Sequence, residues 1–184
     1  MPSSESSITS RGAVYPVLST LRGMALPLYA VIDAARDQSI LPLLLSSTAP
    51  RACLFEGEHA QTLSTHAAYL VHLVQGEPLL ATLVQRGWGH SWGVYLTSNQ
   101  PFDALLAQLR RRVWVRDVGG KTLYFRFFDP RVLRTTLAAM DPAESSDFLG
   151  LVSSYMVEAD PPEAMLCWSM EGGRVHAYKV QISV

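Results

Sequence analysis

The pattern in this chain that comes closest to a catalytic motif is the pentapeptide Gly89-His90-Ser91-Trp92-Gly93. It matches G-x-S-x-G, the nucleophile elbow in which a sharp turn presents a serine hydroxyl for attack on an acyl group. That elbow has to run from a strand, through the serine, into a helix. Here a predicted helix precedes the pattern and a predicted strand follows it. A small hydrolase that uses Ser91 is therefore kept as an alternative to the main interpretation.

The glycines of this segment raise a second possibility, a nucleotide-binding loop. Gly87, Gly89 and Gly93 give the spacing G-x-G-x-x-x-G. Phosphate binds at the N-terminus of a helix, whereas these glycines follow one. The context instead predicts that the glycines let Trp88 and Trp92 pack against a tight turn. We therefore expect a structural role for Trp88, Trp92 and Gly93, and no nucleotide cofactor.

The remaining residues that could be catalytic or bind a metal do not have the spacing of a known site. The five histidines contain no HExxH motif, and no group of cysteine and histidine has the spacing of zinc ligands. Asp33, Glu56 and Glu58 lie near predicted strand ends, where glycosidase acids can also lie, but nothing in the sequence pairs them. We predict no catalytic residue, no metal site and no cofactor, and hence a protein that is not an enzyme.

One stretch of the chain is rich in both arginine and aromatic residues. It holds over half of all lysine and arginine: Arg110, Arg111, Arg112, Arg116, Lys121, Arg126, Arg131 and Arg134. Within it, residues 113–117 and 122–127 are predicted strands, and the glycine pair between them is typical of a hairpin turn. Because successive strand residues point to opposite faces, we expect Leu123, Phe125 and Phe127 to face the core. The opposite face is predicted to show Trp114, Arg116, Tyr124 and Arg126.

Arginine and large aromatic residues are enriched at the centres of protein interfaces, so this face is the predicted partner-binding site. In the alternative interpretation, the arginines form ion pairs with Asp117 and Asp129 and merely cover the sheet. Arg126 fits either interpretation, because it lies three residues before Asp129. A nucleic-acid-binding module would use the same face. The net charge of −1 gives no overall field that attracts nucleic acid, and we expect none as a partner.

Composition places the chain among cytoplasmic globular proteins. Its 184 residues are 48% hydrophobic and 17% charged, enough for one domain with a core that needs neither disulfides nor metal. Two cysteines, Cys53 and Cys167, fit a reducing compartment. The serine-rich start lacks the apolar core of a signal peptide, and no apolar run reaches the length of a membrane span. We predict a cytoplasmic protein without membrane contact.

The elements that must position these residues follow from periodicity and turn signals. Strands are predicted at 28–33, 52–55, 92–97 and 152–157, and a final hairpin at 164–170 and 175–180. Helices are predicted at 40–45, 58–76 and 79–87, and after Pro101, Asp129 and Asp141. The helix at 58–76 rests on the helical spacing of five apolar residues: Leu63, Ala67, Leu70, Val71 and Val74. Asp129-Pro130 is a helix start, since aspartate caps the first amides and proline suits the first turn.

Irregularly interleaved helices and strands with two hairpins predict a mixed α/β (α+β) fold. We expect a central mixed or largely antiparallel sheet with four to five short flanking helices. Residues 1–27 are predicted to be loosely ordered. Residues 28–158 are predicted to form the core domain, and residues 159–184 a C-terminal β-hairpin packed on the same domain.

Six segments, in this order along the chain, resemble the domain-of-unknown-function 4123 family. They are LYAVIDAA (28–35), LFEGE (54–58), AYLVHL (68–73), GWGHSWGVYLTS (87–98), LRRRVWVRD (109–117) and YFRFFDPRVL (124–133). The resemblance covers about residues 28–158. It implies a bacterial type VI secretion adaptor chaperone, which binds a toxic effector in the cytoplasm and helps load it onto the VgrG-type spike protein. It implies an effector as partner, the spike as a further one, and no catalytic residues.

Overall fold

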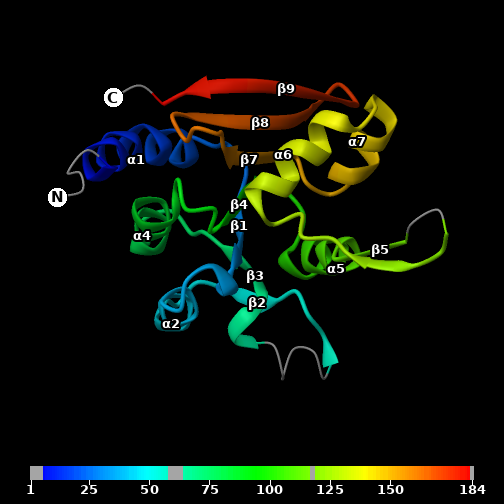
Figure 1. Cartoon of the computed structure of the whole chain (residues 1–184), viewed down its shortest axis with the longest axis horizontal. Coiled ribbons are helices and arrows are strands. Elements are labelled where there is room, and N and C mark those ends of the chain that lie inside the picture. Colours follow the sequence, from blue (N-terminus) through cyan, green and yellow to red (C-terminus); the bar gives the residue numbers. More distant parts are fainter. Residues whose placement is uncertain (1–5, 58–63, 117–118, 183–184) are drawn as a thin grey trace.

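A seven-stranded antiparallel sheet lies between two layers of helices (Figure 1). The computed structural model describes residues 6–57, 64–116 and 119–182, with side chains from residue 14 onward. In order across the sheet the strands are β2 (Arg51–Cys53), β3 (Ala68–His72), β1 (Leu28–Asp33), β4 (Gly93–Thr97), β7 (Ser154–Glu158), β8 (Ala164–Glu171) and β9 (Arg174–Gln181). Every neighbouring pair is antiparallel. The predicted fold class is confirmed.

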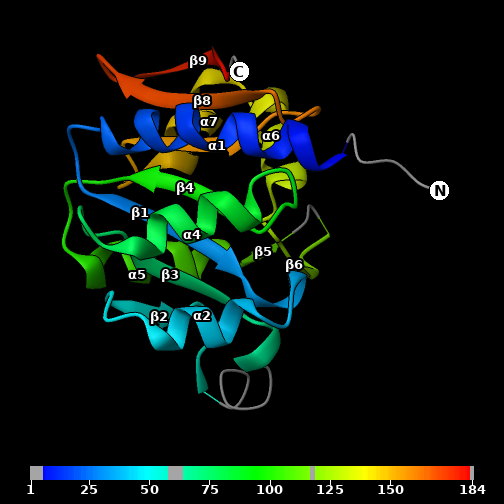
Figure 2. The ribbon, with the colours of Figure 1, turned by 90° about the vertical axis from the view of Figure 1, so that its left-hand side faces the viewer.

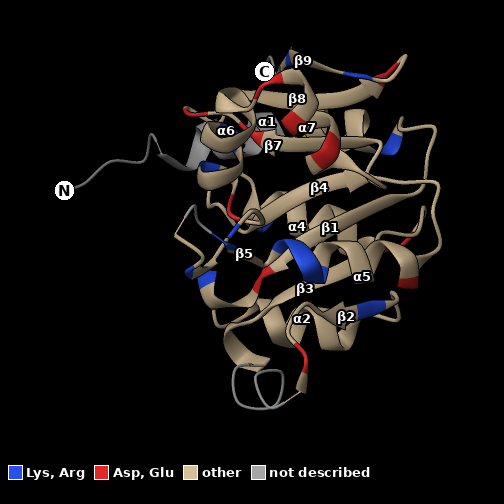
Figure 3. Cartoon of the chain, turned by 90° about the vertical axis from the view of Figure 1, so that its right-hand side faces the viewer, with Lys and Arg blue, Asp and Glu red and all other residues tan. Residues whose placement is uncertain are grey.

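Helices cover both faces of this sheet. One face carries α1 (Ser6–Arg22), α2 (Ile40–Ser46) and α4 (Pro78–Gly87) (Figure 2). The other carries α5 (Phe102–Arg112), α6 (Pro130–Ala139), α7 (Pro142–Leu149) and a separate two-stranded ribbon, β5 (Trp114–Arg116) with β6 (Thr122–Tyr124) (Figure 3). Two short 3-10 helices, η1 (Ala34–Arg36) and η2 (Ser64–His66), flank β1 and β3. Within the described residues, no helix has the length and apolarity that crossing a membrane takes.

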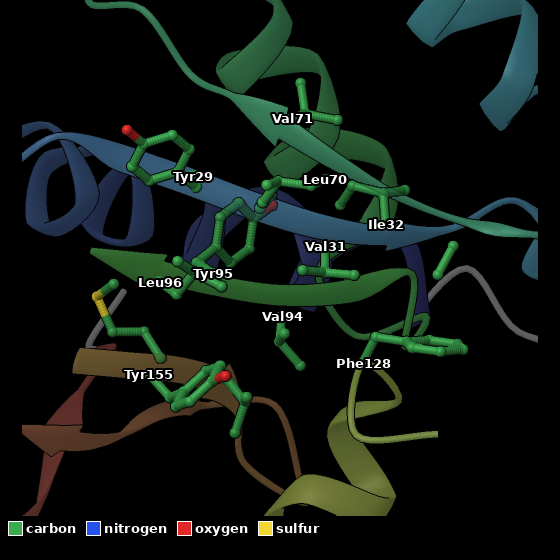
Figure 4. Close-up of a cluster of buried hydrophobic side chains, with 14 of the residues drawn as sticks. Tyr29, Val31, Ile32, Leu70, Val71, Val94, Tyr95, Leu96, Phe128 and Tyr155 are labelled. Carbon is green, nitrogen blue, oxygen red and sulfur yellow. The ribbon is translucent and has the colours of Figure 1, made fainter. Parts of the chain in front are cut away.

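The core is centred on β1, which is buried on both faces along its whole length (Figure 4). Its register pairs Val31 with Leu70 of β3 on one side and with Val94 of β4 on the other. All three residues are fully buried. A central strand covered on both faces has to be apolar without alternation. The unbroken run LYAVID therefore predicts this strand correctly.

Residues 1–27 were predicted to be loosely ordered; residues 1–5 lie outside the described residues, and for residues 6–22 the structure corrects the prediction. Residues 6–22 form α1, which contacts α4, and its Val17 and Leu21 are buried in the core. Val14, Val17, Leu18 and Leu21 recur at three- and four-residue spacing, as on one face of a helix. Pro16, Ser19 and Thr20 between them hide this pattern, and helix formation here depends on packing against the domain.

The predicted helix at 58–76 is also wrong. Residues 58–63 lie outside the described residues, and residues 68–72 form the central strand β3. Ala68 to Val71 are buried one after another, between β2 and β1. A short apolar run satisfies helical spacing by chance, because every position is apolar. The length of the apolar run distinguishes helix from strand better than its spacing does, since a run of about five buried residues is typical of a strand.

The predicted helix starts are confirmed in detail. The Asp129 side chain accepts a hydrogen bond from the Arg131 amide at the start of α6. The Asp141 side chain accepts from the amides of Ala143 and Glu144, and the Asp141 amide in turn donates to the Glu144 side chain. This capping box begins α7. Both short helices thus have their first amides satisfied locally.

Candidate partner-binding site

The predicted hairpin forms as the ribbon β5–β6, with Trp114 directly opposite Tyr124. Their ring centroids are 5.3 Å apart. The Tyr124 ring also contacts Phe55, at 5.8 Å, and Phe128, at 6.3 Å. The Phe125 amide donates to the Val113 carbonyl at 2.8 Å and ties the ribbon to the end of α5. The outer aromatic pair therefore rests on a second aromatic layer that belongs to the domain.

The ribbon exposes a large apolar surface. Trp114 is 49% exposed, and Tyr124 and Leu123 are also exposed. Arg116 lies on the same ribbon face as Trp114 and Tyr124, exposed at the end of β5. Clustered apolar surface of this kind marks interaction sites more often than isolated exposed residues do. Three of the four residues predicted as anchors, Trp114, Arg116 and Tyr124, thus lie together on one small element.

The predicted orientation of this hairpin is wrong in one respect. Leu123 was expected to face the core, but it is 40% exposed, like the rest of β6. Phe125 is half-buried and only Phe127 is fully buried. Strand alternation separates a solvent-exposed face from a buried face only where one face is covered. This two-stranded ribbon extends beyond the helices, so neither of its faces is fully covered. Leu123 pairs with Val115 and is therefore exposed on the ribbon face opposite Trp114 and Tyr124.

Arg126 does not join this surface. The strand ends at Tyr124, so alternation no longer decides where Arg126 points. Its guanidinium Nη2 lies 2.5 Å from Asp33 Oδ2 and 3.9 Å from Asp129 Oδ2. Asp33 is a buried carboxylate that also accepts from the Ala35 amide at 3.1 Å. The side chain predicted as an anchor instead joins the base of the ribbon to the end of β1.

The residues around Asp33 and Arg126 also shift the pKa of Tyr124. Partial burial raises the pKa of its phenol to about 12, the Asp33 carboxylate adds to this rise, and the Arg126 guanidinium opposes it. At neutral pH the hydroxyl is therefore protonated. It can donate a hydrogen bond to an acceptor on a partner.

Most of the predicted basic stretch is paired within the protein. Arg110 Nη1 contacts Glu56 at 2.8 Å, and Arg112 contacts Asp147 at 3.3 Å. Further pairs join Arg131 to Asp129 at 2.6 Å and Arg134 to Asp160 at 3.5 Å. Of the two carboxylates grouped with Asp33 in the sequence, Glu56 is in such a pair, and Glu58 lies outside the described residues, as does Asp117. Figure 3 shows basic and acidic positions interspersed over this face.

Asp129 carries several of these contacts. Its carboxylate is buried and receives the Arg131 amide, Nε and Nη2. Burial acts to raise its pKa, but the hydrogen bonds and charge of Arg131, with the charge of Arg126, outweigh burial and lower it. The Asp129-Pro130 motif thus has the structural role predicted for it.

The glycine turn is likewise built for packing. Trp88 and Trp92 are both buried, and the Trp88 indole Nε1 donates to the Pro162 carbonyl at 2.9 Å. A Cβ on Gly93 would lie 2.1 Å from the Val31 carbonyl oxygen. β1 and β4 therefore approach so closely that only glycine fits at position 93. The structural role predicted for Gly93 is present, but the neighbour that requires it is the β1 backbone, not a tryptophan ring.

Ser91 occupies this turn in a left-handed conformation, with φ of 55°. It is buried, and its hydroxyl donates to Glu158 Oε1 at 3.0 Å. The Ser91 amide donates to the same oxygen at 3.0 Å, and the Gly89 amide to Glu158 Oε2 at 2.6 Å. Burial raises the pKa of Glu158, and these hydrogen bonds act in the opposite direction. The serine is held in the interior by a carboxylate and follows a helix, unlike an elbow nucleophile.

Sequence reasoning missed Glu158, the residue that holds the turn from β7. A single acidic residue at the end of a predicted strand carries no signal of this role. In the described part of the chain, no group of three or more histidine, cysteine, aspartate or glutamate residues is arranged to hold a metal ion.

The family model that matches the chain is "Domain of unknown function (DUF4123)", over residues 28–147. This chain belongs to the DUF4123 family. The match begins at β1 and ends within α7, so it includes the glycine turn, the ribbon and the Asp129 cap. No curated protein and no solved structure matched the chain.

Proposed function

We propose that this DUF4123 protein is a cytoplasmic adaptor chaperone, which binds a type VI secretion effector and helps load it onto the VgrG-type spike protein. Membership of the family supports this class through the resemblance described above. The observation that carries the binding role is the exposed aromatic surface of the ribbon, made by the facing pair Trp114 and Tyr124 with Arg116 at its edge.

The ribbon is suited to binding because its anchors are held in place before a partner arrives. Tyr124 packs on Phe55 and Phe128, and Arg126 pairs with the buried Asp33 below. An anchor that is already ordered loses less conformational entropy on binding. Truncation of a buried aromatic or arginine anchor costs about 2 kcal/mol or more in a typical interface.

We also propose that the protein performs no catalysis. The hydroxyl of Ser91 is buried and donates to Glu158, and this geometry supports a structural role. We expect esterase, peptidase, nuclease and glycosidase assays to show no turnover. A turnover that disappears in the variant Ser91→Ala, while that variant stays folded, would contradict the proposal.

Co-expression with the product of the neighbouring gene, which we expect to be the effector, tests the adaptor role. We expect the two proteins to co-purify. The variant Trp114→Ala/Arg116→Ala should keep the native Tm and weaken effector binding at least tenfold in calorimetry, because each factor of ten is about 1.4 kcal/mol. We leave Tyr124 intact because it also packs against the domain. Tyr15→Ala is the matched control, since it removes an aromatic ring that is 79% exposed on α1.

The outcomes separate the two parts of the proposal. Absence of any complex would refute the effector-binding role itself. A complex that the ribbon variant forms with wild-type affinity would show that the cargo binds elsewhere. Binding to DNA or RNA that weakens steeply with salt would favour the nucleic-acid alternative, which the pairing of the arginines does not support.

A further inference from the structure

Strand β9 forms one edge of the large sheet, and none of the described elements covers its outer side. Figures 1 and 2 both show β9 at the rim of the sheet, with no helix or strand beyond it. It is eight residues long, and six of them are exposed. A long edge strand presents a row of unpaired backbone donors and acceptors, which proteins usually shorten, bend or cover. This one is neither short nor covered.

The register shows which backbone groups face outward. β8 and β9 pair continuously from Ala164–Gln181 to Glu171–Arg174. The Ile182 amide donates to the Glu163 carbonyl at 2.9 Å, which places the next pair of the ladder in the hydrogen-bonded class. Hydrogen-bonded pairs recur at every second position of an antiparallel ladder. The residues whose amide and carbonyl point toward β8 are therefore Arg174, His176, Tyr178 and Val180.

The alternate residues of β9 direct their amide and carbonyl groups away from the sheet. These are Val175, Ala177, Lys179 and Gln181. Within residues 6–57, 64–116 and 119–182, no group is hydrogen-bonded to them. These free donors and acceptors recur at every second residue, as on any unpaired sheet edge. The ligand that suits such an edge is another extended chain, bound through main-chain hydrogen bonds.

We propose that β9 takes up an extended, acidic segment of the effector as an added strand of the sheet. This inference rests on the proposed effector-binding role and adds a second contact to the ribbon. The acidic character follows from the charges of the strand: β9 carries Arg174 and Lys179, both exposed, and no acidic residue. Opposite charges on facing strands stabilise the pair, and like charges destabilise it.

The same charges argue against a second copy of this chain as the occupant. Antiparallel self-pairing of β9 would bring Arg174 and Lys179 of both copies to one interface, with no acidic residue of β9 to face them. Lysine on an edge strand is a device by which proteins discourage such pairing. A segment that carries aspartate or glutamate would instead be attracted to Arg174 and Lys179.

Ala177→Pro tests the inference, because it removes an outward amide and no hydrogen bond to β8. Proline is tolerated on an edge strand where the missing amide faces solvent. We expect this variant to fold and to bind the co-expressed effector at least tenfold more weakly in calorimetry. Ala177→Thr is the matched control, since it keeps the amide and suits a strand, and its affinity should equal that of the wild type.

Amide hydrogen exchange of the wild-type protein supplies a measurement that needs no variant. In the free protein, the amides of His176, Tyr178 and Val180 should exchange slowly and those of Val175, Ala177 and Lys179 rapidly. Addition of the effector should slow exchange at the second group. If Ala177→Pro does not fold, Lys179→Glu replaces it, and we expect at least tenfold weaker binding because the charge is reversed.

Each outcome bears on a different claim. If the effector binds but the outward amides stay unprotected and both variants bind normally, strand addition is wrong and the adaptor role stands. If the wild type binds no effector, the adaptor role fails and the inference fails with it. Protection of the outward amides without effector, together with a doubled mass in solution, would show that a second copy is the occupant and would overturn the inference.

Discussion

Replacement of Arg126 by methionine should destabilise the fold, although Arg126 lies in a segment rich in surface cations. Its guanidinium lies 2.5 Å from the carboxylate of Asp33, which is only 2% exposed. Without it, Asp33 keeps one side-chain hydrogen bond among the described residues, from the Ala35 amide. A buried carboxylate without its cation keeps most of its desolvation cost.

The expected size follows from the burial of the two partners. Removal of one member of a fully buried ion pair costs about 3–5 kcal/mol. Arg126 is 39% exposed, so water reaches its side of the pair and screens the interaction. We therefore expect Arg126→Met to lower the free energy of unfolding by about 2–4 kcal/mol. Arg116→Met is the control, because Arg116 is exposed on the ribbon, and its effect should stay within about 0.5 kcal/mol.

Urea unfolding of a double-mutant cycle measures the pair directly. Asp33→Asn removes the charge that Arg126 neutralises, so the double variant should lose less stability than the sum of the single variants. We expect a coupling energy of about 1–3 kcal/mol. A coupling energy near zero, with Arg126→Met as stable as Arg116→Met, would refute this account. Arg126 would then be available as the partner anchor predicted from alternation.

Three further predictions concern the glycine turn. Gly93→Ala should cost about 3 kcal/mol or more in thermal unfolding, because its Cβ would overlap a β1 carbonyl, whereas Gly120→Ala, in open space, should cost only about 1 kcal/mol; equal losses would contradict the close approach. Trp92→Ala should cost about 3–5 kcal/mol, since its ring is buried, and an unchanged melting curve would show that it is not. Glu158→Gln should cost about 1–3 kcal/mol, because one carboxylate oxygen that accepts backbone amides is lost. The raised pKa of Glu158 means that its stabilising contribution falls as pH rises from the ordinary glutamate value through the raised one. The gap in stability between wild type and Glu158→Gln should therefore narrow with rising pH, and a widening gap would contradict this sign.

Local patterns in the sequence predicted the elements whose stability is local. The Asp129 and Asp141 caps depend on neighbours two or three residues away, so a short motif is sufficient to recognise them. The C-terminal hairpin is recognised in the same way, from the Gly172-Gly173 turn between two alternating runs. The helix–turn–strand order around Ser91 was also predicted correctly, and it is the reverse of the order in a nucleophile elbow.

Local patterns failed where coverage by the rest of the domain decides the outcome. Residues 68–72 satisfy both helical and strand spacing, and pairing with β1 and β2 makes them a strand. Leu123 has the same strand phase as Phe125 and Phe127, yet the ribbon extends past the helices and leaves it exposed. In both cases the same sequence pattern suits two environments, and the packing of distant elements selects one.

Residue types and near neighbours are sufficient to predict the capped helix starts, the two hairpins and the buried strand β1. The contacts that define the sites, and the close approach of β1 that requires glycine at position 93, exist only in the folded domain. Arg126 meets Asp33 from 93 residues away, and Glu158 meets Ser91 from 67 residues away. The strand order, which leaves β9 at an edge, is likewise a property of the whole sheet. Such contacts follow from the chain path, and no local spacing encodes them.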